Sequence, residues 1–208
     1  MLKPTVVLVA ALTSVLAAAG SLSAQAPAAK PPAAKPPAAK PAAAKPATQP
    51  GADPVKRGKY LVVFGGCSDC HTPKLLTPNG LALDSSRLLS GHPSDVAVNP
   101  PQLGMLSPDG WMAATNMHLT AWVGPWGVTF AANLTPDATG LGSWSDSTFI
   151  ATMRSGKHMG VGRDILPPMP WQSLGALTDD DLKAIFAFLK SVKPVQNVVP
   201  SAMTPSLH

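Results

Sequence analysis

The sequence of 208 residues contains no glutamate and only two cysteines, too few for a four-thiolate zinc site. Its 11 acidic residues are therefore all aspartate, against 16 Lys and Arg, for a formal net charge of +5. The excess of positive charge lies before Asp53, and the chain from Asp53 onward has as many acidic as basic residues. A nucleic-acid partner, which would require a basic folded domain, is therefore excluded.

The N-terminus lacks an apolar run of full membrane-spanning length. A run from Val6 to Leu22 follows the single Lys3 and precedes Ala24-Gln25-Ala26, a small-x-small cleavage pattern. We expect residues 1–26 to be a signal peptide and the mature protein to be periplasmic. The alternative is an uncleaved anchor, which would keep the protein near the membrane or cell envelope.

Residues 27–52 lack any pattern from which a core could be built. They repeat a unit close to Pro-Ala-Ala-Lys-Pro, and proline fixes φ and removes backbone donors. We expect a disordered linker that favours polyproline II. It would serve as a tether or solubilising tail, with a basic arm that docks on a partner as the alternative.

The two cysteines stand in one motif, Cys67-Ser68-Asp69-Cys70-His71. This C-x-x-C-H spacing is typical of covalent attachment of a c-type haem, with Cys67 and Cys70 forming thioethers and His71 binding the iron. A redox dithiol and half a zinc site are the alternatives. No βαβ pattern surrounds the motif, and the other histidines are scattered singly. One covalently bound haem c is therefore the expected cofactor.

Two helices are expected at the ends of the folded domain. Asp53-Pro54 is an N-cap signature, and the first helix should run to the pair Gly65-Gly66. Thr178 begins an acidic N-terminal capping sequence, followed by an apolar stripe that Pro194 ends. Gly58 in the first helix costs helical stability, so we expect it to permit close approach of another helix.

This order resembles the class I c-type cytochromes over roughly residues 53–192. The resemblance implies an all-α cytochrome c fold in which the N- and C-terminal helices cross at Gly58, with His71 as proximal ligand. The expected domain is 53–194, with a long loop insertion at 75–128 and a flexible tail at 195–208.

Met169 is the expected sixth ligand of the iron. It stands in Leu166-Pro167-Pro168-Met169-Pro170-Trp171, where three prolines stiffen the backbone around a weak thioether ligand. Class I cytochromes present a distal methionine from such a loop before the last helix. Met159 and His158 are the alternatives, and His158 would give a lower potential.

A closer resemblance is to the cytochromes associated with periplasmic dehydrogenases. It rests on residues 133–137, 140–146, 154–157 and 167–171, and a second C-x-x-C-H motif, as dihaem members have, is absent. In those proteins the first two stretches line the haem, so Asn133 and Trp144 are candidates to donate to its propionates. The alternative interpretation, which the sequence favours equally, is that Trp144 belongs to the core and Asn133 caps a turn.

These residues together predict an electron carrier and not an enzyme, because two axial ligands leave no open position on the iron. The resemblance implies a periplasmic or membrane dehydrogenase as donor and an oxidase or another cytochrome as acceptor. One alternative is a tethered cytochrome subunit of a dehydrogenase complex. The other is a haem enzyme or gas sensor with a displaceable distal ligand.

Overall fold

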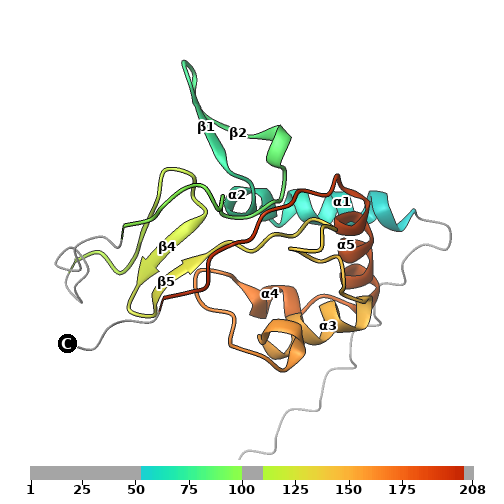
Figure 1. Cartoon of the computed structure of the whole chain (residues 1–208). Helices are drawn as coiled ribbons and strands as arrows, with labels where there is room; N and C mark the ends of the chain where they lie inside the picture. Colours follow the sequence, from blue (N-terminus) through green and yellow to red (C-terminus); the bar gives the residue numbers. More distant parts are fainter. Residues whose placement is uncertain (1–52, 100–109, 204–208) are drawn as a thin grey trace, which may run out of the picture. The chain divides into compact units, whose positions relative to one another are not determined.

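The computed structural model describes residues 53–99 and 110–203. Within them five α-helices surround a common core, and five strands form two small antiparallel sheets (Figure 1). The helices are α1 (Pro54–Phe64), α2 (Cys67–His71), α3 (Asp146–Ser155), α4 (Trp171–Gly175) and α5 (Asp179–Ser191). The strands are β1 (Lys74–Thr77), β2 (Gly80–Leu83), β3 (Ala114–Thr115), β4 (Ala121–Gly124) and β5 (Gly127–Phe130), and the 3-10 turns are η1 (Ser85–Arg87) and η3 (His158–Gly160).

The two predicted terminal helices are confirmed, with their caps. The Asp53 carboxylate accepts from the backbone N–H of Val55 at 2.9 Å at the start of α1. The Thr178 hydroxyl accepts from the N–H of Asp181 at 3.1 Å at the start of α5. Both caps satisfy backbone donors that the first turn leaves free, so these local signals fix where each helix begins.

Helices α1 and α5 pack closely at Gly58, as the sequence predicts (Figure 1). A Cβ atom on Gly58 would lie 1.9 Å from the carbonyl oxygen of Ala184. No side chain fits in that space, so glycine is what allows the two backbones to approach.

The core lies between this helix pair and α3. Ser145 is the N-cap of α3, and its hydroxyl accepts from the Thr148 N–H at 3.1 Å. Phe149 of α3 stacks on Phe186 of α5 with ring centroids 5.4 Å apart. The buried cluster consists of Val62, Leu89, Leu141, Phe149, Met153, Leu182, Ile185, Phe186 and Leu189.

The two sheets show that the all-α prediction is wrong. Strands β1 and β2 form a hairpin, and β3, β4 and β5 form a second antiparallel sheet, almost wholly within the predicted loop insertion 75–128. Gly80 and Gly127 begin the second strand of their hairpins with positive φ values of 103° and 95°. The two-residue turns that precede them are Pro78-Asn79 and Pro125-Trp126, so part of the predicted loop forms hairpins.

Residues 195–203 pack on the domain, whereas the sequence suggested a flexible tail. The amide nitrogen of buried Asn197 donates to the carbonyls of Ser90 at 2.7 Å and His92 at 2.8 Å. Its oxygen accepts from the Ser94 N–H, and Met203 forms backbone hydrogen bonds with Val128. The last part of the chain therefore ties the insertion to the helical core.

Replacing Asn197 with alanine is expected to lower the free energy of unfolding by about 3 kcal/mol, because buried backbone groups lose their partners. Urea unfolding followed by circular dichroism measures the change. Exposed Gln196, changed to alanine, is the matched control and should have almost no effect. Equal stability of the two variants would show that the segment does not hold the insertion.

The predicted signal peptide, 1–26, and linker, 27–52, lie outside the described residues, as do the last five residues of the tail. Within the described ranges, the helices are too short or too polar to span a membrane.

Candidate functional site

The C-x-x-C-H motif forms helix α2, directly after α1. Gly66, between the two helices, has a φ of 63°, and a Cβ there would lie 2.8 Å from a carboxylate oxygen of Asp69. Cys67 and Cys70 are three residues apart on the helix, so their side chains are neighbours on one face. Both thiols are free and half-buried. This placement fits attachment of both sulfurs to one flat group.

The surroundings of the two thiols favour their protonated form. Burial raises the pKa of Cys67 and of Cys70, and for Cys70 the nearby Lys74 charge partly offsets this. A redox dithiol instead needs a lowered pKa. Across the part of the chain that the structure describes, no three His, Cys, Asp or Glu side chains converge as a metal site. Neither alternative to haem attachment gains support from these contacts.

The imidazole of His71 is buried and fixed in one orientation. Its Nδ1 lies 2.8 Å from the carbonyl oxygen of Ala132. A carbonyl can only accept, so Nδ1 carries the hydrogen and the neutral ring has its lone pair on Nε2. Burial lowers the pKa of His71 and keeps the ring neutral, although the bond to Ala132 opposes this. Nε2 is thus prepared to bind a metal.

Met169 lies half-buried in the loop between η3 and α4. The hydroxyl of Thr129 in β5 donates to the Pro167 carbonyl at 2.9 Å, and the Trp171 N–H donates to the Met169 carbonyl at 2.9 Å. Trp171 packs against Gly156, where a Cβ would lie 2.4 Å from the indole ring. The loop that carries the thioether is therefore held on both sides.

Strand β5 and the residues after it connect the two candidate ligands. Thr129 holds the Met169 loop, and Ala132, three residues later, holds the His71 ring. Sequence reasoning missed both residues. Their roles depend on a hydroxyl and a backbone carbonyl that contact distant parts of the chain, and no motif marks either one.

Asn133 is buried with its polar atoms engaged by protein groups. Its oxygen accepts from the backbone and hydroxyl of Thr135 at 3.0 and 2.8 Å. Its nitrogen donates to the Val195 carbonyl at 2.9 Å and to the Thr139 hydroxyl at 3.1 Å. These contacts match the alternative in which Asn133 caps a turn, and its N–H groups are already used.

Trp144 is half-buried and packs against the core cluster. Its ring meets that of His158 edge-on, with centroids 5.3 Å apart. His158, the alternative ligand, is exposed and stands in η3. These contacts leave the role of Trp144 toward a propionate a prediction.

The histidines of the insertion have structural partners. The Nε2 of fully buried His92 lies 3.0 Å from the Val96 carbonyl, and its Nδ1 lies 2.9 Å from the Thr120 hydroxyl. The Nδ1 of His118 lies 2.9 Å from the Lys74 carbonyl. Both rings are therefore engaged by protein groups.

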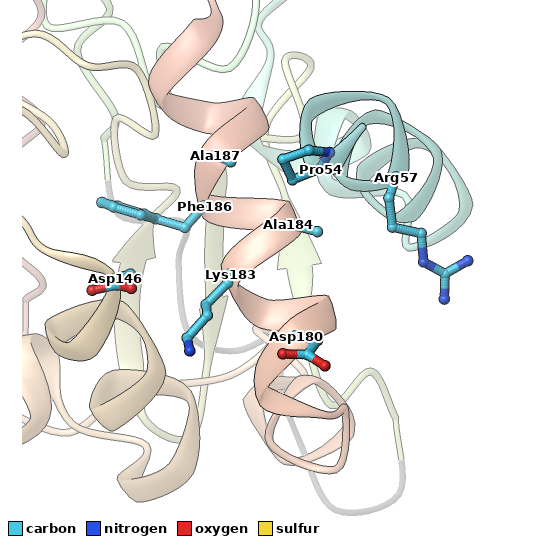
Figure 2. Close-up of a pocket in the computed structure, with 8 residues that line it drawn as sticks. All are labelled: Pro54, Arg57, Asp146, Asp180, Lys183, Ala184, Phe186 and Ala187. Carbon is cyan, nitrogen blue, oxygen red and sulfur yellow. The ribbon is translucent and has the colours of Figure 1, made fainter. Parts of the chain in front are cut away.

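A groove between α1, α5 and the start of α3 is separate from these residues. Figure 2 shows basic and acidic side chains on its walls, among them Arg57 and Asp146. It is lined by Pro54, Arg57, Asp146, Asp180, Lys183, Ala184, Phe186 and Ala187. None of the predicted haem-binding residues lines this groove.

The chain is similar to subunits of several dehydrogenases, although no protein-family model matches it. It is 34% identical over 150 residues to an alcohol dehydrogenase (quinone) cytochrome c subunit of Gluconacetobacter polyoxogenes, covering 70% of this chain and 26% of that one. It is 30% identical over 143 residues to a gluconate 2-dehydrogenase cytochrome c subunit of Pantoea cypripedii, covering 68% and 24%. A nicotinate dehydrogenase subunit of Pseudomonas putida is 28% identical over 150 residues, which cover 71% of this chain and 9% of that one.

The chain thus spans about a quarter or less of the length of these relatives. The matched stretch nevertheless covers about 70% of the chain, and two of these relatives are named as cytochrome c subunits. Over most of its length the chain is therefore similar to the cytochrome c subunits of dehydrogenases.

Proposed function

We propose that the chain is a periplasmic electron carrier with one covalently attached haem c, bound through Cys67 and Cys70. His71 and Met169 would bind its iron. The haem, when bound, supplies a one-electron couple at its iron. The chain's own residues hold it, select its ligands and shield it from water, and they catalyse no bond change in a substrate.

The hydrogen bond between His71 and Ala132 is the observation that carries this proposal. Because it commits Nδ1, the only lone pair left on the ring is that of Nε2. Histidines that bind metal characteristically donate their other N–H to a carbonyl or carboxylate in this way. The two thiols directly before this ring complete a donor set that suits haem.

Met169 would supply the second protein ligand to the iron in this proposal. A thioether has no charge to draw it to the metal, so the backbone must bring it there. The bonds from Thr129 and Trp171 hold its loop on either side. With both positions filled by the protein, small molecules are kept from the iron, which favours electron transfer over chemistry at the metal.

Replacing Met169 with alanine is expected to abolish the weak red absorption band that methionine ligation gives oxidised haem. The reduction potential should fall by on the order of 0.1 V or more, since axial ligands set potentials over a range of about 0.8 V. Optical spectra and a spectroelectrochemical titration measure both effects.

Met159→Ala is the matched control, because Met159 is the alternative thioether and is exposed in η3. This variant should keep the band and the potential. If the band survives in Met169→Ala and disappears in Met159→Ala, the ligand assignment is wrong. Rapid cyanide binding by the unaltered oxidised protein would contradict a filled sixth position.

The donor in this proposal is a dehydrogenase, and the acceptor is an oxidase or another cytochrome. Several relatives are named as subunits, which supports a dehydrogenase partner and equally the tethered-subunit alternative. Size-exclusion chromatography of the protein purified from its own cells separates the two. A permanent subunit elutes with a dehydrogenase, and a diffusing carrier elutes alone.

A further inference from the structure

Lys74 is a buried lysine next to the haem-binding motif. It is the first residue of β1, three residues after His71, and only 7% of its surface is exposed. Lysine is almost never this buried unless its charge is paired or hydrogen-bonded. The burial of the Lys74 side chain therefore implies that its ammonium group has hydrogen-bond partners.

The ammonium group points back to the carbonyl end of α2. Its Nζ donates to the carbonyls of Thr72 at 2.6 Å and Asp69 at 2.8 Å, with longer contacts to Ser68 at 3.4 Å and His118 at 3.5 Å. The last carbonyls of a helix have no partner within the helix and carry partial negative charge. One side chain thus holds the end of the helix that carries the cysteines and His71.

The charge of this ammonium is not neutralised by an ion pair. All four acceptors are uncharged carbonyls, and none of the ion pairs within the described residues involves Lys74. The titratable groups that face it are the Asp69 carboxylate, the Cys70 thiol and the His71 ring. Asp69 is exposed, so water screens much of its effect.

The positive charge lies beside the groups that would hold the iron. The Nζ of Lys74 is 2.8 Å from the carbonyl oxygen of Asp69 and 2.6 Å from that of Thr72, the residues that directly precede Cys70 and directly follow His71. Reduction adds an electron to the site, and a fixed positive charge in a poorly solvated place favours that state.

We propose that Lys74 is a positioning residue for the attachment helix and that its buried charge raises the reduction potential of the iron bound by His71. This inference rests on the proposed haem-binding function. It adds to it a residue outside the motif that sets the driving force for electron transfer.

Three variants of the full haem-loaded chain test this: Lys74→Met, Lys74→Gln and Lys74→Arg. Lys74→Met removes the charge and the hydrogen-bond donors, Lys74→Gln keeps two N–H donors without charge, and Lys74→Arg keeps the charge. Lys74→Met and Lys74→Gln are expected to lower the equilibrium constant for reduction about tenfold, which is about 59 mV for one electron. Lys74→Arg should keep most of the potential of the unaltered protein. Spectroelectrochemical titration at fixed pH and salt gives the values.

Lys59→Met is the matched control, because Lys59 is an exposed lysine on α1 and loses the same charge. Its potential should hardly change, since water and salt screen an exposed charge. A shift in reduction potential in Lys74→Met and Lys74→Gln no larger than in this control would overturn the proposal. If Lys74→Met does not fold, the difference in potential between Lys74→Gln and Lys74→Arg decides by the same criterion. Absence of covalent haem from the unaltered chain would instead contradict the proposed function itself.

Discussion

Changing Cys67 and Cys70 together to serine is expected to remove all covalently bound haem. Serine oxygen does not replace the sulfurs in the thioether bonds, and the sequence has no other cysteine. A denaturing gel stained for haem should show a band for the unaltered protein and none for the double variant. Intact mass spectrometry should show the mass of the polypeptide alone.

Ser68→Ala is the control, because Ser68 lies between the cysteines and uses only its backbone carbonyl in the contact with Lys74. This variant should retain full haem staining. Each single cysteine variant should retain one thioether and give less haem-bearing protein. Haem staining of the double variant equal to that of the unaltered protein would refute attachment at this motif.

Replacing Gly58 with alanine is expected to destabilise the domain by about 3 kcal/mol, because the new Cβ would force α1 and α5 apart. The carbonyl oxygen of Ala184 would lie 1.9 Å from that atom, and backbone cannot move aside as a flexible side chain does. Denaturant unfolding of the haem-loaded protein measures the loss.

The sign of this change separates packing from helix propensity. Alanine in place of an exposed helical glycine would stabilise by about 1 kcal/mol. Lys59→Ala, on the exposed side of α1 next to Gly58, controls for changes in the helix itself and should be nearly neutral. An increase in stability for Gly58→Ala would mean that the two helices do not meet there.

The parts of the fold that could be predicted from sequence are those with local causes. Asp53 and Thr178 cap their helices through bonds within three residues, and a glycine in a helix indicates close packing without naming the partner. Side-chain type and spacing contain this information. The confirmed helices and their contact at Gly58 follow from it.

The sheets could not be predicted in the same way. The strands have two to four residues, too few for a clear alternation, and their stability depends on pairing and on the elements around them. Asn197 looks like any polar residue in a tail, although its side chain joins three backbone groups about a hundred positions earlier. Contacts of this range have no signal in the local sequence.

The residues of the candidate site also differ in whether the local sequence marks them. The motif at 67–71 and the proline-flanked Met169 stand out in the sequence, because the proposed covalent attachment and thioether ligation need particular residues in particular settings. Lys74, Thr129 and Ala132 are not, since they act through contacts that only the folded chain creates. For Asn133, a role toward the haem stays a prediction, and its observed hydrogen bonds are with Thr135 and Val195.

The distance along the chain between His71 and its partner also bears on the order of events during synthesis. Ala132 lies 61 residues after His71, so a growing chain contains the whole attachment motif long before the carbonyl that fixes the ring. Helix α5, which packs on α1, is completed later still. The His71 ring therefore takes its observed orientation only when a segment that follows it far along the chain has folded against it.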